Sequence, residues 1–150
     1  MNDENFWMLD YLVNAISVDK NYDAYHVFKN MSLIEMLIIK PNKGKCEGEM
    51  EAKLPLFMKS DSLDPSLKIK FSQITRKLRN KIGHGDFIGV HKLLDQYKNI
   101  IIPEYNYDEI EYSVENWNYL SICCKLDEIL SEIIWILLTD KEELLKIQYS

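Results

Sequence analysis

Apolar residues recur at helical spacing along most of this chain, and the pattern predicts a succession of helices. Over about Glu4–Ser17, and again over about Asp23–Lys40, large apolar side chains stand three or four residues apart. This spacing places them on one face of an α-helix. Pro41 ends the second helix, because proline cannot continue the hydrogen-bond ladder. A weaker helix is expected over Glu47–Lys59, where Pro55 starts or interrupts it.

The clearest helix start in the chain is the pair Asp64 and Pro65. An aspartate side chain caps the free amides of a first turn, and proline suits the first helical position. The apolar spacing that follows predicts a helix to about Lys81, and Gly83 and Gly85 end it.

The rest of the chain reads as three more helices and a connector. A helix is expected over Asp86–Lys98, followed by an extended connector or short strand, Asn99–Pro103, in which residues 100–102 are the strand candidate. A long helix is expected over about Asp108–Leu138, bent near Ser113, and a last helix capped by Thr139 or Asp140 reaches about Tyr149. The prediction is an all-α fold, a helical bundle with a long C-terminal helix, and residues 1–150 form one domain.

Composition narrows the classes of function. The net charge of −6 argues against a protein that coats nucleic acid without regard to sequence. The apolar runs are too short to span a membrane, so no membrane partner is expected. The cysteines, Cys46, Cys123 and Cys124, are odd in number and include an adjacent pair, which favours a reducing, cytoplasmic location. No Cys/His spacing resembles a zinc site, so neither a metal nor a cofactor is expected.

Charge is unevenly distributed along the chain. Residues 65–85 contain six cations and no acid on a protein that is otherwise acidic: Lys68, Lys70, Arg76, Lys77, Arg79 and Lys81. A solvated helix face accounts for such a basic island without any function. Two of the six are the chain's only arginines, Arg76 and Arg79. Guanidinium matches the oxygens of a phosphate with a rigid fork of donors, which the ammonium of lysine does not.

A histidine, His84, follows Arg79 after four intervening residues, and Asn80 lies between them. The form Arg-x4-His with a polar residue after the arginine resembles the signature of the HEPN family of small all-helical domains. The segment 78–85 looks most like the Apea-like branch of that family. So does the apolar segment 28–37, which ends in Leu33, Glu35 and Leu37 in the order Leu-x-Glu-x-Leu.

The resemblance implies a metal-independent endoribonuclease that acts as a homodimer, with two motifs forming one composite site. In this chain Arg79 would hold the scissile phosphate, and His84 would be the general base or acid. Asn80 would orient one of them, Glu35 would support Arg79, and Arg76, Lys77 and Lys81 would bind flanking phosphates of the RNA. The same resemblance implies a bacterial defence or toxin-type effector, which an antitoxin or another regulatory partner would restrain.

Each of these residues also has a purely structural interpretation. Arg79 could be an ion-pair partner of Glu35, and His84 could cap the end of its helix. Some HEPN modules are non-catalytic and bind RNA, a nucleotide or a partner protein, and a plain helical scaffold is a third alternative. His26 and His91 are interpreted as ordinary polar positions. The aromatic residues Tyr105, Tyr107, Tyr112, Trp117 and Tyr119 could stack RNA bases, or form core and dimer surface.

Overall fold

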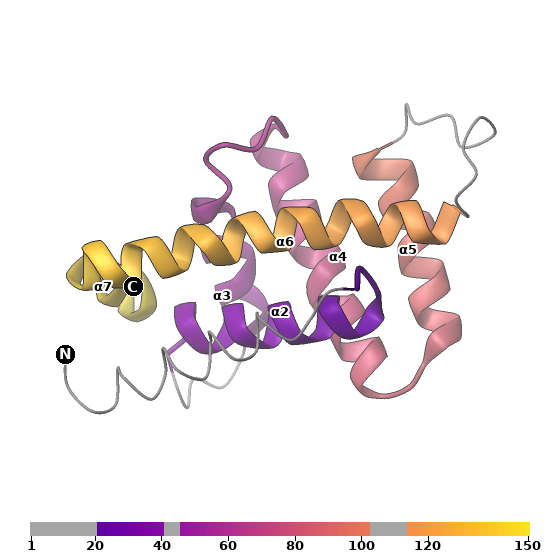
Figure 1. The fold of residues 1–150 in the computed structure, drawn as a ribbon, viewed down its shortest axis with the longest axis horizontal. Helices are drawn as coiled ribbons and strands as arrows, with labels where there is room; N and C mark the ends of the chain where they lie inside the picture. The colour runs from indigo at the N-terminus through magenta and orange to yellow at the C-terminus, as the bar shows by residue number, and fades with distance from the viewer. Residues whose placement is uncertain (1–20, 41–45, 103–113) are drawn as a thin grey trace.

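The computed structural model describes residues 21–40, 46–102 and 114–150, and all regular structure in these ranges is helical (Figure 1). The predicted all-α class is confirmed. The elements are α2 (Ala24–Ile38), α3 (Cys46–Lys53), the 3₁₀ helix η1 (Leu54–Phe57), α4 (Pro65–Gly83), α5 (Phe87–Ile101), α6 (Val114–Thr139) and α7 (Lys141–Tyr149). The expected helix over Glu4–Ser17 and the expected bend near Ser113 lie outside the described residues.

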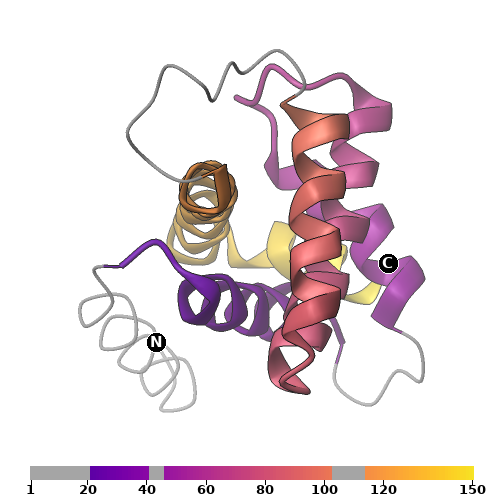
Figure 2. The same ribbon diagram turned by 90° about the vertical axis from the view of Figure 1, so that its right-hand side faces the viewer.

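Two pairs of helices cross to form the body of the molecule. α4 and α5 make an antiparallel hairpin that stands upright in Figure 2, where α2 and α6 are seen nearly end on. α2 and α6 lie side by side and run in the same direction across this hairpin (Figure 1). α7 turns back after α6 and contacts α2. The C-terminal end of α4 therefore lies where α2, α4 and α5 meet.

A hydrophobic core fills the space between these helices. From α4 it receives Phe71, Ile74 and Leu78, which are spaced three and four residues apart and are almost fully buried. The Phe71 ring meets Tyr97 of α5 edge to face, with 6.2 Å between the ring centroids. Burying one large apolar side chain contributes about 1.5–3 kcal/mol, so this face fixes how α4 is rotated. The polar residues of α4 consequently lie on its remaining surface.

Aspartates start four of the helices. Asp23, Asp64, Asp86 and Asp140 each accept a hydrogen bond from the backbone amide three residues later, at 2.9–3.3 Å. This confirms the predicted cap of α4 and shows that Asp140, rather than Thr139, caps α7. Each cap satisfies an amide that has no partner within its own helix.

Proline and glycine shape the other boundaries as expected. Pro55 lies in η1, so the helix expected over Glu47–Lys59 is observed as a short α-helix followed by a 3₁₀ turn. α4 ends at Gly83, and Gly85 after it has φ of +70°, a left-handed conformation that glycine adopts without strain. His84 between them is the C-cap residue of α4, as the sequence predicts.

The expected connector or strand over Asn99–Pro103 is wrong for its first residues. α5 continues to Ile101, which is buried one turn after the buried Tyr97. The isoleucines of this segment suit a strand by propensity, but Ile101 extends the apolar face of α5 onto the core. Tertiary packing has therefore overridden local preference.

No helix in the described ranges is both long and apolar enough to cross a membrane.

Candidate functional site

The cations in the second half of α4 lie on two different faces. Residues 79 and 80 each lie three or four positions from residues 76 and 83, which places all four along one stripe of the helix. Arg79 and Gly83 of this stripe contact α2. Residues 77, 81 and 84 form a neighbouring stripe, and Lys77 and Lys81 line a pocket shared with α5. The basic island thus has an arginine face and a lysine face.

Arg79 lies against α2 and keeps most of its hydrogen-bonding capacity unused. Its Nη2 is 3.6 Å from Oε2 of Glu35, and its Nη1 donates to Oδ1 of Asn80 at 3.3 Å. Its Nε is buried and has no hydrogen-bond partner among the described residues. The side chain is 34% exposed, so part of it is open to solvent. The contact between Arg79 and Glu35 that the sequence suggested is present.

Phe28 sets the position of this guanidinium. The Cζ of Arg79 lies 5.6 Å from the centroid of the Phe28 ring, a cation–π arrangement. On the same stripe, a Cβ at Gly83 would stand only 3.0 Å from Cε2 of Phe28. Gly83 therefore has a packing role in addition to helix termination, because it leaves room for the ring on which Arg79 rests.

His84 is exposed at the end of α4, and only its backbone takes part in the cap. Its backbone amide donates to the carbonyl oxygen of Asn80 at 3.1 Å. Within the described residues its imidazole makes no hydrogen bond or ion pair, so the side chain is available for other contacts. Asn80 is half-buried and touches both Arg79, through its side chain, and His84, through its backbone.

Arg79 and His84 do not share a face of α4. Five residues of α-helix turn through about 500°, which leaves the two positions about 140° apart around the axis. They are also separated by about 7.5 Å along it. A single chain therefore presents the guanidinium and the imidazole in different directions.

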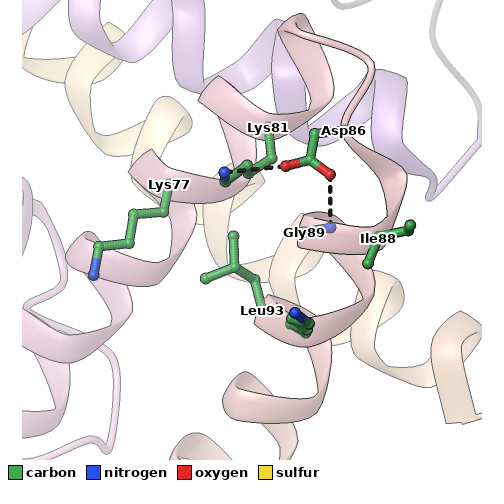
Figure 3. Close-up of a pocket in the computed structure, with 7 residues that line it drawn as sticks. Lys77, Lys81, Asp86, Ile88, Gly89 and Leu93 are labelled. Carbon is green, nitrogen blue, oxygen red and sulfur yellow. Dashed lines mark hydrogen bonds and ion pairs between the residues drawn. The ribbon is translucent and has the colours of Figure 1, made fainter.

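Lys77 and Lys81 line a pocket of about 310 Å³ between α4 and α5 (Figure 3). The Lys81 ammonium is 3.1 Å from Oδ2 of Asp86, whose other oxygen accepts the amide of Gly89 at 3.0 Å. The Gly89 amide, followed by Lys81, holds the pKa of the Asp86 carboxyl below its usual value. Of the residues predicted to bind flanking phosphates, Arg76 thus lies on the arginine face and these two lysines on the other.

The remaining sequence candidates are dispersed or lie outside the described ranges. Trp117 is half-buried and Tyr119 is buried on α6, which fits the core interpretation, while Tyr105, Tyr107 and Tyr112 lie outside the described residues. No group of three or more potential metal-ligating side chains occurs within residues 21–40, 46–102 and 114–150.

One polar cluster was not singled out from the sequence. His26 of α2 is buried, and its Nε2 is 2.6 Å from Oδ1 of Asp127 on α6. The same oxygen accepts from Nδ2 of Asn30 at 2.7 Å, and Nδ1 of His26 lies 2.8 Å from the carbonyl oxygen of Asn21. The cluster joins two helices that are about one hundred residues apart in sequence, so no local pattern could have revealed it.

The adjacent cysteines of α6 have different environments. Cys123 is buried and Cys124 is exposed. Partial burial, with Asp127 and Glu128 nearby, raises the pKa of the Cys124 thiol. A raised pKa disfavours the reactive thiolate, which argues against a nucleophilic role for this residue.

Comparison with protein-family models, with curated proteins and with solved structures found no match for this chain.

Proposed function

We propose that this protein is a metal-independent endoribonuclease whose active site forms when two copies of the chain associate. The observation that carries the proposal is the state of Arg79. Its guanidinium lies against Phe28 and Glu35 with an unused buried donor, and the side chain is partly open to solvent. A rigid, permanently charged fork held in this way suits a phosphate group that carries developing negative charge.

His84 supplies the second half of the chemistry. Its imidazole can take a proton from a ribose 2′-OH as a general base, or give one to the departing 5′-oxygen as a general acid. Its exposed side chain leaves it free to meet a substrate. The products of 2′-OH attack are a 2′,3′-cyclic phosphate and a 5′-hydroxyl end.

The separation of the two side chains around α4 is the reason for proposing a dimer. Within one chain, Arg79 and His84 point in different directions and would not both reach one phosphate. In a dimer, Arg79 of one copy and His84 of the other can face the same phosphate. The role of Asn80 in this scheme is to orient Arg79, with which it forms a hydrogen bond. Glu35 supports the guanidinium from α2.

The second candidate is a non-catalytic module that binds RNA, a nucleotide or a partner protein. The same separation favours it if the chain does not dimerise, because Arg79 alone can bind a phosphate without cleaving it. On its resemblance to HEPN domains, we further propose that the protein is a defence or toxin-type effector under the control of an antitoxin.

Replacing His84 with alanine tests the proposal. We expect RNA cleavage to fall by about 100- to 10,000-fold, the usual cost of losing a general acid or base. Because the imidazole is exposed and the cap uses the backbone, the unfolding midpoint in urea should stay close to that of the unchanged protein. The matched control is His91→Ala, an exposed histidine on α5. Equal cleavage by the two variants would contradict the proposal.

A further inference from the structure

The pocket between α4 and α5 combines apolar walls with a cationic rim. Ile88 and Leu93 of α5 line it, together with Gly89 and the side chains of three lysines, Lys77, Lys81 and Lys92. Its volume of about 310 Å³ is at the lower end of the range for small-molecule sites. Among the described residues, the only carboxylate that lines it belongs to Asp86.

The charges of the pocket are not balanced internally. Lys81 is paired with Asp86, and that carboxylate is also committed to the Gly89 amide. Lys77 and Lys92 make no ion pair with any described residue, and Lys92 acts on the Asp86 carboxylate only as a weaker charge attraction. Two ammonium groups therefore remain available at the rim, and they favour an anionic ligand.

The floor of the pocket is closely packed. A Cβ at Gly89 would stand 2.7 Å from Oδ2 of Asp86 and 2.9 Å from Cδ of Lys81. Glycine at this position lets the Lys81 stem and the Asp86 carboxylate lie directly on the first turn of α5. Figure 3 shows Lys81 and Asp86 meeting over the start of α5, with Leu93 between the two helices. The ion pair with Asp86 holds Lys81 in place, so the cations available to a ligand are Lys77 and Lys92.

We propose that this pocket binds one nucleotide of an RNA strand, with its phosphate on Lys77 and Lys92 and its sugar and base against Ile88 and Leu93. The inference deepens the proposed function and rests on it for the identity of the strand. A phosphate alone would need no apolar wall, and an apolar ligand would need no ammonium rim. α4 with its side chains is about 10–12 Å across, so the bound nucleotide is not the one whose phosphate meets Arg79.

The test follows the backbone amide signals of Gly89 and Lys92 by nuclear magnetic resonance in the full chain. The probes are adenosine 5′-monophosphate, adenosine and inorganic phosphate, each added to the same sample conditions. The expected result is a saturable shift with the nucleotide, and much weaker effects from adenosine or phosphate alone. If phosphate binds as tightly as the nucleotide, the pocket is only an anion site and the inference is wrong. If no probe shifts these signals, it is also wrong.

Matched variants separate the pocket from general charge. Lys77→Gln with Lys92→Gln removes two charges from the rim, and Lys59→Gln with Lys70→Gln removes two exposed charges elsewhere. We expect the first pair to weaken nucleotide binding at least about tenfold, the effect of losing a charge-assisted hydrogen bond, and the second pair to change it little. An equal loss in both pairs would overturn the inference. Ile88→Ser, at an exposed wall position, should weaken binding of the nucleotide but not of phosphate.

An RNA cleavage assay on the same proteins distinguishes the two proposals. A chain that binds the nucleotide at Gly89 but cleaves no RNA would retain the pocket and contradict the endoribonuclease. If RNA is cleaved equally well with and without Lys77 and Lys92, and no nucleotide shifts the signals, the endoribonuclease is retained and the nucleotide pocket is contradicted.

Discussion

At the scale of single residues, Arg79 is the least satisfied strong donor in the motif. A guanidinium has five N–H donors, and the described contacts of Arg79 use one for Asn80 and direct another loosely at Glu35. The buried Nε without an acceptor costs free energy, since an unpaired polar group is expensive to bury. A phosphate bound where this side chain is exposed would accept from the Nη donors that the described contacts leave unused.

Arg79→Lys separates catalysis from binding. The substitution keeps the positive charge but loses the planar fork and its contact with Phe28. We expect turnover to fall by about 100- to 1,000-fold, as when one donor to a transition-state oxyanion is lost. The affinity for RNA should change little, because attraction between opposite charges remains. Single-turnover rates and binding measured on the same RNA would check both.

The control for this variant is Arg76→Lys, the same exchange one turn earlier on the same stripe of α4. Arg76 is expected to hold a flanking phosphate by its charge, so its replacement by lysine should leave turnover nearly unchanged. Normal turnover in Arg79→Lys, or the same loss in both variants, would remove Arg79 from the mechanism.

At the scale of the elements, the sequence predicted the helices better than the contacts between them. Asp64 with Pro65 and Gly83 with Gly85 marked both ends of α4, because capping and helix termination are local chemistry. The end of α5 was missed, since burial of Ile101 depends on the rest of the fold. The position of Phe28 under Arg79 was not predicted for the same reason, although the Glu35 contact was.

Asp127 should stabilise the junction of α2 and α6. Asp127→Ala removes the acceptor that His26 and Asn30 share, and leaves both groups without that partner in a largely buried site. We expect the free energy of unfolding to fall by about 1–3 kcal/mol, measured by urea denaturation. Glu128→Ala, at the exposed next position, should change it by less than about 0.5 kcal/mol. Equal effects of the two substitutions would mean that the cluster does not hold the helices together.

The carboxyl group of Asp64, which caps α4, should make the stability of the fold depend on pH in the acidic range. The hydroxyl of Ser66 and then the amide of Leu67 lower the pKa of its carboxyl below the ordinary value. A lowered folded-state pKa stabilises the fold above the ordinary carboxyl pKa of about 3.9, and this contribution is lost as pH falls through the lowered value. Asp64→Asn retains a good cap but cannot titrate. Its melting temperature should therefore fall less on acidification than that of the unchanged protein, and a parallel fall would contradict this assignment.

At the scale of the whole molecule, an acidic protein presents a small cationic region at one end of a helical hairpin. The net charge of −6 disfavours indiscriminate attraction to RNA, so the proposed function requires RNA to be contacted through this region. Near it, exposed aromatic side chains occur at the start of two helices, Tyr25 on α2 and Phe87 on α5, 65% and 62% exposed. Exposed apolar side chains beside a proposed composite site are suitable for contact with a second copy.

We therefore expect a homodimer formed through the helices that flank the motif. Light scattering at micromolar concentration should give twice the mass of one chain. Phe87→Ser should shift the measured mass toward that of one chain and reduce RNA cleavage. Leu138→Ser, at a similarly exposed apolar position on α6, should change neither. A monomeric protein that still cleaves RNA would exclude a composite site.

In the proposed mechanism, the RNA strand is cleaved by its own 2′-OH at Arg79 and His84, without a metal. The most direct measurement uses an RNA that the protein cuts at one position, in excess chelator, beside the same RNA with a single 2′-deoxy sugar on the 5′ side of the cut. We expect a 2′,3′-cyclic phosphate on the first RNA and no cleavage at that position of the second. Cleavage of the deoxy substrate, or activity that disappears with chelator, would contradict this mechanism and leave a binding module as the better description.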